Sequence, residues 1–324
     1  VVNFDVSLFP EGSETKASIF SPDGSNVTTD AITLRSTDDF ALTEDVIATN
    51  DGGFAVSWTD TDSSFGSVQL FDSSGNAETG LFASNQAGSE ELADPDGGRF
   101  IAAWDRNENS DALTEGAPDD IFAQFFNEDG SSIGNEFRLN DEVEGDQTLS
   151  DVAALPGGEF VAVWSDPNAG AGPVDGTEVQ GRIFNSNGTP KTSQFTVNTT
   201  SLNTQEKAKI AVLEDGRFVV TWEDDSRSGE DTSGAAIRAQ AFTQAGERIG
   251  EERLINEETE GDQRNPEIAS VGQNRVVIGW DNKNGVGNIL DSLGNTKLQV
   301  LTLGETSGEA NNPPNVTADS AQTA

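Results

Sequence analysis

The strongest constraint in this sequence is a strand-like segment that recurs along the chain. The segment from Asp215 to Trp222, with the sequence DGRFVVTW, opens with a turn dipeptide, continues with β-formers and ends at tryptophan. This pattern is typical of a short strand entered through a tight turn. Related segments end at all the other tryptophans, which are Trp58, Trp104, Trp164 and Trp280. Because every tryptophan occupies the same repeat position, the sequence predicts a repeat protein.

The copies align with a period of 58 residues. Triplets that keep this spacing are Asn140, Asn198 and Asn256; Gln147, Gln205 and Gln263; Phe126, Phe184 and Phe242; and Gly130, Gly188 and Gly246. Each unit contains four strand-like segments, for example residues 209–213, 217–222, 237–242 and 252–255. Short segments of β-formers separated by glycine and aspartate turns, without helical periodicity, predict an all-β fold.

The number of units predicts the architecture. Residues 1–36 match the second, third and fourth strands of a unit but lack the first, and five further units follow. We therefore expect an all-β, six-bladed β-propeller of four-stranded antiparallel blades, with one blade shared by the N- and C-termini. The propeller is expected over residues 1–308 and a C-terminal tail over residues 309–324.

The tail has two interpretations. Residues 314–319 resemble the first strand of a unit, so they could pair beside Phe4–Leu8 and close the ring. Alternatively, residues 311–324 are a linker to a following module, and they resemble the junctions before cadherin-like modules in giant bacterial surface proteins. We favour closure, because an open ring leaves an unpaired sheet edge at each end.

Composition limits the chemistry of the chain. Asp and Glu number 57 against 18 Lys and Arg, which gives a net charge of -39. Such a surface repels nucleic acid and anionic membranes and attracts cations or basic partners. Cysteine, methionine, histidine and tyrosine are absent, which excludes disulfides, thiolate or imidazole metal sites and a tyrosine nucleophile. Without a long apolar run or a basic, apolar leader, we expect no insertion into a membrane.

Long acidic loops predict cation binding. In a meandering blade the loops after the second strand and between units emerge on one face, and here they include residues 223–234 and 256–263. Calcium prefers six to eight oxygen ligands from such loops, so Ca²⁺ is the hypothesis for a bound cofactor. The alternative is a set of solvated turns, in which Asp and Asn are favoured by turn geometry alone. The candidate metal ligands are Asp105, Asn107, Asn109, Asp111, Asp166, Asn168, Asp175, Asp224, Asp225 and Asp231.

The repeated tryptophans and glutamines have structural and functional interpretations. Regular spacing on a strand favours tryptophans that pack between neighbouring sheets over an aromatic platform for sugar. The glutamines precede the first strand of each unit at a fixed distance. We expect them to satisfy backbone groups of the loops rather than line a central channel.

The repeat resembles a known type of module. Its segments appear here as residues 209–213, Asp215–Trp222, Phe122–Asn127 and Asn135–Asn140. Together they resemble the propeller-like repeats of large secreted RTX-type and adhesin-like proteins of marine bacteria. The resemblance implies a bacterial protein that is extracellular or on the cell surface. The Gly-Gly-x-Gly-x-Asp calcium repeat of RTX proteins is absent, so calcium binding cannot be inferred from this resemblance.

These observations favour a non-enzymatic extracellular module. We expect a structural or adhesive segment, or the repeating subunit of a surface layer or filament, with divalent cations on its acidic loops. Its partners would be a second copy of itself or a surface glycan or protein. A lectin-like carbohydrate-binding propeller is the alternative, followed by a glycosidase that uses a pair of carboxylates. No spacing in the sequence selects such a pair.

Overall fold

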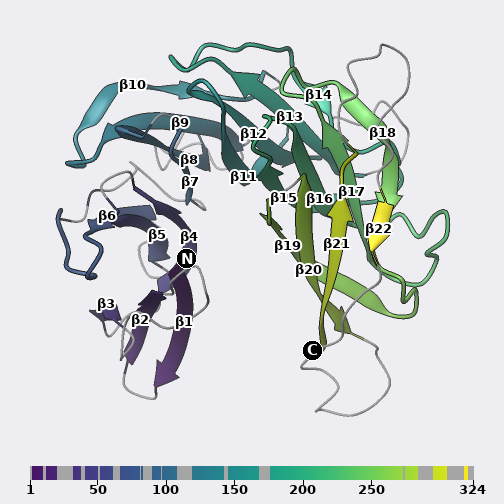
Figure 1. Cartoon of the computed structure of the whole chain (residues 1–324), viewed down its shortest axis with the longest axis horizontal. Coiled ribbons are helices and arrows are strands. Elements are labelled where there is room, and N and C mark those ends of the chain that lie inside the picture. The colour runs from purple at the N-terminus through teal and green to yellow at the C-terminus, as the bar shows by residue number, and fades with distance from the viewer. Residues whose placement is uncertain are drawn as a thin grey trace. The chain divides into compact units, whose positions relative to one another are not determined.

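The computed structural model describes residues 2–9, 12–19, 32–37, 41–49, 52–60, 66–80, 82, 90–95, 97–107, 119–141, 145–167, 176–272, 274–283, 295–304 and 317–319. Within these ranges the regular secondary structure is entirely β, from β1 to β22 (Figure 1). The chain divides into two compact units, one of residues 1–115 and 121–138, the other of residues 116–120 and 139–324.

The first unit contains three antiparallel sheets. Their strands are β1 (Val2–Phe9), β2 (Gly12–Ile19) and β3 (Ile32–Thr37); β4 (Ala41–Ala48), β5 (Phe54–Asp60) and β6 (Gly66–Phe71); and β7 (Glu90–Ala93), β8 (Arg99–Asn107), β9 (Asp119–Asn127) and β10 (Ser132–Arg138). Beside β6, Val68 forms an isolated antiparallel bridge with Phe82.

The second unit contains three four-stranded antiparallel sheets. Their strands are β11 (Thr148–Leu155), β12 (Glu159–Asp166), β13 (Glu178–Phe184) and β14 (Phe195–Thr196); β15 (Gln205–Val212), β16 (Phe218–Asp224), β17 (Ala236–Phe242) and β18 (Arg248–Leu254); and β19 (Asp262–Ser270), β20 (Arg275–Lys283), β21 (Asn295–Thr302) and β22 (Thr317–Asp319). In each sheet the strands follow one another in sequence order, so each sheet is a meander.

The fold class is therefore confirmed: the chain is all-β and consists of antiparallel β-propeller blades. The predicted number of six blades is wrong, because β4 to β22 form five blades and β1 to β3 form a separate three-stranded sheet. The predicted blade shared by the two termini is also wrong. The tail strand β22 pairs with β21, with Val300 opposite Asp319, and completes the last blade instead. This pairing satisfies the edge of β21, whose backbone groups would otherwise lack partners.

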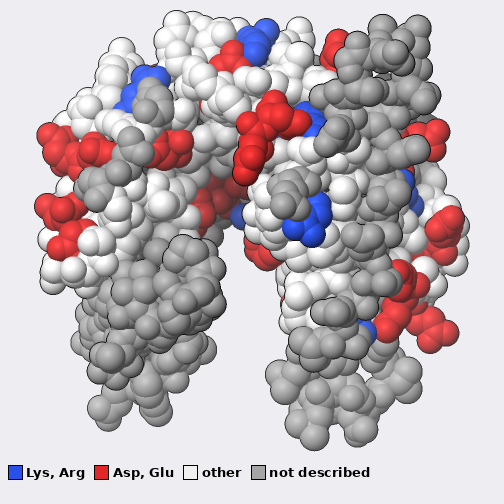
Figure 2. All heavy atoms as spheres, viewed as in Figure 1, with Lys and Arg blue, Asp and Glu red and all other residues white. Residues whose placement is uncertain are grey.

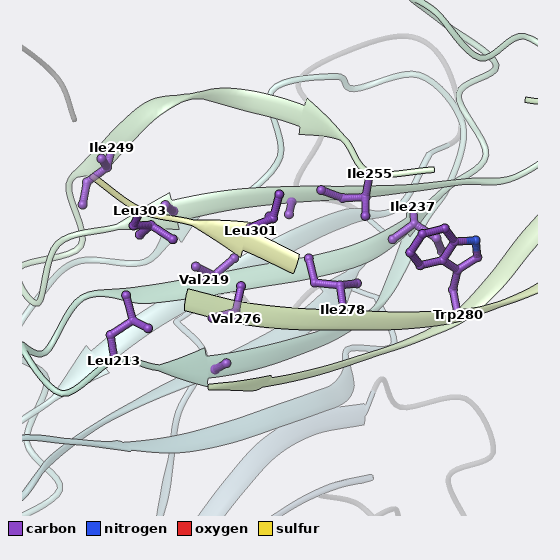
Figure 3. Packing of buried hydrophobic residues seen from close by; sticks show 13 residues of the cluster. Leu213, Val219, Ile237, Ile249, Ile255, Val276, Ile278, Trp280, Leu301 and Leu303 are labelled. Atoms are coloured by element: carbon purple, nitrogen blue, oxygen red, sulfur yellow. The ribbon is translucent and has the colours of Figure 1, made fainter. Parts of the chain in front are cut away.

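Tryptophans pack between neighbouring sheets, as the repeat predicts. Trp222 of β16 is fully buried in a cluster that includes Val161 and Val179 of the preceding sheet. Trp280 of β20 lies in the equivalent cluster beside Ile237 and Ile255 of its own preceding sheet (Figure 3). A sheet of this kind is buried on both faces, and every residue of β16 is buried.

Stacked phenylalanines add a second repeated contact. Phe160 and Phe184 are direct cross-strand partners with ring centroids 4.8 Å apart. Phe218 and Phe242 repeat this pair 58 residues later at 5.2 Å. Such cross-strand aromatic pairs fix the register of the second and third strands of a blade.

The first strand of each blade in the second unit carries a β-bulge. The register shifts after Leu149 in β11, after Glu206 in β15 and after Arg264 in β19. In the latter two bulges Lys207 and Asn265 have positive φ angles of 53° and 55°. A bulge of this kind redirects the side chains around it, and bulges are frequent next to functional sites.

Truncation of a buried tryptophan tests this packing. We expect Trp222→Ala to lower the free energy of unfolding by about 3–5 kcal/mol, because the cavity would lie between two sheets. Leu202→Ala is the control, since Leu202 is 50% exposed and its truncation should change stability by less than about 0.5 kcal/mol. Urea denaturation followed by far-ultraviolet circular dichroism measures both values. Equal midpoints for the two variants would contradict the proposed role of the tryptophan.

Candidate functional site

Two of the predicted metal ligands, Asp224 and Asp225, contact donors from the protein. Asp224 is buried and accepts hydrogen bonds from Arg238 Nε, Gln205 Nε2 and Ser226 Oγ. Asp225 faces Arg264, with 3.5 Å between Oδ1 and Nη2. A calcium site would need oxygens directed at one point rather than at arginines and amides.

Of the other predicted ligands, the structure describes the side chains of Asp231, Asp105 and Asp166. Asp231 accepts hydrogen bonds from Asn256 Nδ2 at 2.7 Å and from the backbone N–H of Ser233 at 3.0 Å. Asp105 lies in β8, and the buried Asp166 ends β12. The side chain of Asn107 is not described, and Asn109, Asp111, Asn168 and Asp175 lie outside the described residues. Within the described ranges, no three acidic side chains are grouped as a metal site, and calcium binding by the remaining loop residues stays a prediction.

The repeated asparagines and glutamines form buried amide clusters between blades. Asn198 Nδ2 donates to Gln205 Oε1 at 3.2 Å and to the Thr200 carbonyl at 2.9 Å. Gln205 Nε2 in turn donates to the Leu202 carbonyl at 2.8 Å. The same asparagine–glutamine contact recurs at Asn140 with Gln147 and at Asn256 with Gln263. The prediction that these glutamines satisfy backbone groups of the loops is confirmed.

A different cluster of charged side chains surrounds the bulge of β15. It contains Glu206 and Lys207 of β15, Glu223 at the end of β16, Asp225 just beyond it and Arg264 of β19. We call these five residues the bulge cluster. Glu206 and Glu223 are direct cross-strand partners, so their side chains lie on the same face of the sheet. The ladder continues beyond β16, since Asp225 N donates to the Thr204 carbonyl at 2.9 Å.

Glu223 is the buried anion of the bulge cluster. Its carboxylate accepts hydrogen bonds from Lys207 Nζ at 3.1 Å, from Arg264 Nη1 at 3.1 Å and from the backbone N–H of Asn265 at 2.6 Å. It is 1% exposed, and a buried carboxylate of this kind is tolerated only with charge partners and hydrogen bonds. Two of its three donors come from the next sheet, so the cluster ties β16 to β19.

Glu206 is the partly buried carboxyl of the bulge cluster. Burial and the neighbouring charges of Glu223 and Asp225 raise the pKa of Glu206, although Lys207 and Arg264 act in the opposite direction. The side chain of Asp225 is 31% exposed. The cluster thus combines one carboxyl that retains its proton more readily than usual with a second, partly exposed carboxyl group beside an arginine. Acid–base catalysis by a carboxyl pair needs an acid with a raised pKa and a second carboxylate.

Sequence reasoning selected only Asp225 from the bulge cluster. A signal was present in the columns of the repeat, where Thr148, Glu206 and Arg264 share one position, as do Ser165, Glu223 and Asp281. The charge at these two repeat positions differs between copies, whereas the position before each of them is glutamine or tryptophan in all three copies. Residues that depart from a repeat next to residues that keep it are candidates for chemistry, because the constant columns already account for the scaffold.

On the face that Figure 2 shows, red acidic side chains are more widespread than blue basic ones, and uncharged residues cover most of the described surface. In the first unit, a hollow of about 630 Å³ is lined by Glu78, Phe82, Glu128 and Asp129 among others. Among the described residues there is no helix that could cross a membrane.

Comparison with known proteins identifies the fold but not the family. No family model and no curated protein sequence matches the chain. Among solved structures, hydrazine synthase of Kuenenia stuttgartiensis is similar with a TM-score of 0.51 and 14% identity; the match covers 85% of this chain and 65% of that one. A protein of unknown function from Dyadobacter fermentans has a TM-score of 0.57 at 11% identity, covering 87% and 83% of the two chains.

A third similar structure is an enzyme that acts on carbohydrate. It is the GH93 α-L-arabinofuranosidase of Fusarium graminearum in complex with arabinobiose, with a TM-score of 0.51 at 12% identity, covering 87% of this chain and 85% of that one. The prediction that the chain is not an enzyme is contradicted by this similarity to a glycoside hydrolase. That prediction rested on the lack of any spacing in the sequence that selects a pair of catalytic carboxylates. Repetition builds the blades, whereas catalysis depends on a few positions that differ between them.

The raised pKa of Glu206 makes stability depend on pH in a defined direction. The charged form destabilises the folded chain at pH values above the raised pKa, because the unfolded carboxyl titrates near 4.5. This destabilisation diminishes as the pH falls through the pKa of Glu206 in the folded chain, and it is absent below the pKa of the same group in the unfolded chain. We expect Glu206→Gln to raise the melting temperature by about 1–3 °C at about pH 8 and to have no such effect at about pH 4.

Differential scanning calorimetry of both proteins across this pH range tests the expectation. Glu214→Gln is the matched control, because Glu214 is an exposed glutamate in the turn between β15 and β16. It should change the melting temperature little at either pH. A lower melting temperature for Glu206→Gln at neutral pH would show that the charge of Glu206 is stabilising and would contradict this account.

Proposed function

We propose that this chain is a glycoside hydrolase whose acid catalyst is Glu206 and whose second catalytic carboxylate is Asp225. The observation that carries the proposal is the bulge cluster, in which two carboxyl groups on one face of a sheet have different environments. Glu206 is partly buried and has a raised pKa, and Asp225 is partly exposed beside Arg264. Glycoside hydrolysis commonly uses a pair of carboxyl groups, one of which has a raised pKa and acts as the acid.

In the proposed reaction Glu206 donates its proton to the glycosidic oxygen as the bond between that oxygen and the anomeric carbon breaks. Asp225 accepts a proton from the water that adds to the anomeric carbon. The proton lost by Glu206 and the proton gained by Asp225 balance the addition of one water molecule to the glycoside. Glu223 lies opposite Glu206 and is too buried to contact substrate, so we assign it a positioning role.

The positions of the two carboxyl groups favour one stereochemical course. Asp225 is diagonal to Glu206 on the neighbouring strand, and the backbones of residues at such positions are about 7–8 Å apart, from which two side chains on one face can place their carboxyl groups at a similar separation. Inverting enzymes separate their carboxyl groups by about 6.5–9.5 Å, which leaves room for a water molecule, whereas retaining enzymes use about 5–5.5 Å. We therefore propose inversion at the anomeric carbon.

The similarity to the arabinofuranosidase of Fusarium graminearum supports carbohydrate as the class of substrate to test first. The proposed reaction uses only carboxyl groups, so it is open to a chain that has no histidine, cysteine or tyrosine. When Glu206 carries the proton that it donates, the two remaining carboxylates balance Lys207 and Arg264, and the bulge cluster has no net charge. It then offers no excess positive charge to a uronic acid, so neutral sugars are the substrates to test first.

Hydrolysis of a panel of glycosides tests the proposal. The full chain is incubated with 4-nitrophenyl glycosides of neutral pentoses and hexoses and with neutral polysaccharides, and nitrophenol and reducing sugar are measured. We expect Glu206→Gln and Asp225→Asn each to lower kcat on an active substrate by about 100- to 10,000-fold. Glu214→Gln should retain the activity of the unchanged chain. An unchanged chain that hydrolyses no member of the panel, or full activity in Glu206→Gln, would refute the proposal.

Leaving-group dependence and product analysis test the two roles separately. Because a dinitrophenyl leaving group needs no protonation, Glu206→Gln should lose much less activity on dinitrophenyl glycosides than on alkyl glycosides, and Asp225→Asn should lose activity on both. The first product detected by proton NMR should have the anomeric configuration opposite to that of the substrate. Retention of configuration would assign Asp225 a different role.

A further inference from the structure

Hydrogen bonds from the segment before β15 hold the backbone of Asp225. The N–H of Asp225 donates to the Thr204 carbonyl at 2.9 Å, and the carbonyl of Asp225 accepts from Asn203 Nδ2 at 3.0 Å. Asn203 has a positive φ angle of 58°, a conformation that asparagine adopts more readily than most residues. The place of Asp225 therefore depends on the position of the segment that leads into β15.

A buried arginine anchors the loop on the other side. Asp224, the residue before Asp225, is 1% exposed and accepts a hydrogen bond from Arg238 Nε. Arg238 Nη2 donates to the Ser228 carbonyl at 2.9 Å. Arg238 Nη1 lies 3.2 Å from Glu252 Oε1, and only 4% of the Glu252 side chain is exposed. One guanidinium thus joins the loop after β16 to strand β18.

Glu252 connects this arginine back to the segment before β15. Its carboxylate accepts hydrogen bonds from the N–H and the hydroxyl group of Thr199, the latter at 2.7 Å. Arg238 and Glu252 therefore join the loop after β16 to the segment before β15. Because the same two segments already meet at Asp225, these contacts form a closed ring that includes it.

The preceding blade has the same fold without this arginine and this glutamate. The position of Arg238 is Gln180 in that blade, since each of the two residues pairs with the tryptophan of its own second strand. The position of Glu252 is Gln194, 58 residues earlier. A blade of this repeat therefore folds with glutamine at both positions, whereas the ion pair occurs in the blade that carries Glu206.

We propose that Arg238, held by Glu252, is a positioning residue for Asp225. This inference rests on the role of Asp225 in the proposed function. Arg238 contacts the residue before Asp225 and the carbonyl three residues after it, so it acts on where the Asp225 carboxylate lies and not on the substrate. A displacement of about 1 Å in a catalytic group can lower the rate about 100-fold, so a rigid support at this place affects the reaction directly.

The double variant Arg238→Gln/Glu252→Gln tests the proposal, because it gives this blade the two glutamines of the preceding one. We expect it to remain folded by circular dichroism and to lower kcat on an alkyl glycoside by about 10- to 100-fold, with KM changed by less than about threefold. In a chain that already carries Asp225→Asn, the same double change should lower kcat no further, because it acts through Asp225. An equal loss in both backgrounds would overturn the proposal.

Lys191→Gln/Glu159→Gln is the matched control. It removes another ion pair, with 2.6 Å between Lys191 Nζ and Glu159 Oε2, from the preceding blade. It should retain the kcat of the unchanged chain. If the first double variant fails to fold, Glu252→Gln alone decides the proposal, because this change is isosteric and leaves Arg238 paired with Asp224. It should lower kcat in the same way but to a smaller degree.

Amide hydrogen exchange tests the positioning separately from activity. In Arg238→Gln/Glu252→Gln the N–H of Asp225 should exchange about tenfold faster than in the unchanged chain, whereas the N–H of Val220, in the centre of β16, should keep its protection. This pattern in a chain that hydrolyses no glycoside would refute the glycosidase and still support the positioning of Asp225. Equal protection of the Asp225 N–H in both proteins would refute the positioning role whether or not the chain is active.

Discussion

The packing of one sheet against the next is the interaction on which the rest of this structure depends. Each sheet has two apolar faces, and a four-stranded meander cannot bury both by itself. Trp222 and Trp280 fill equivalent positions between neighbouring sheets. The stacked rings of Phe218 and Phe242 hold β16 and β17 of one blade in register. Tandem copies of one unit supply a packing partner of the same shape for each neighbouring sheet.

The same packing also brings charged side chains of two neighbouring sheets together. The bulge in β15 directs Lys207 away from the regular ladder, and the equivalent bulge in β19 brings Arg264 and the N–H of Asn265 to Glu223. A buried carboxylate needs several donors, and here they come from two sheets rather than one. This arrangement raises the pKa of Glu206, first through burial of its carboxyl group and then through the neighbouring charge of Glu223.

Repeat positions that keep the same residue in each copy stabilise the fold, and positions that vary are open to other roles. Asn198 and Gln205 make the same contacts as their counterparts in neighbouring blades, and these contacts satisfy loop backbone groups that would otherwise be buried without partners. Glu206 stands one residue after Gln205, yet its column contains threonine and arginine in the adjacent copies. A position that is free to vary within a rigid frame can acquire a function without loss of the fold.

The sequence by itself determined the all-β fold, the strand order within each blade and the packing role of the tryptophans, because these depend on short-range alternation and a constant period. It also placed the amides at Gln205 and its counterparts correctly. Only the tertiary structure decided the number of blades and the partner of β22, since strand pairing depends on which edge is within reach and not on resemblance between strands. It likewise decided the site: residues 206, 223 and 264 carry no motif, and their charges interact only because a bulge and a neighbouring sheet bring them together.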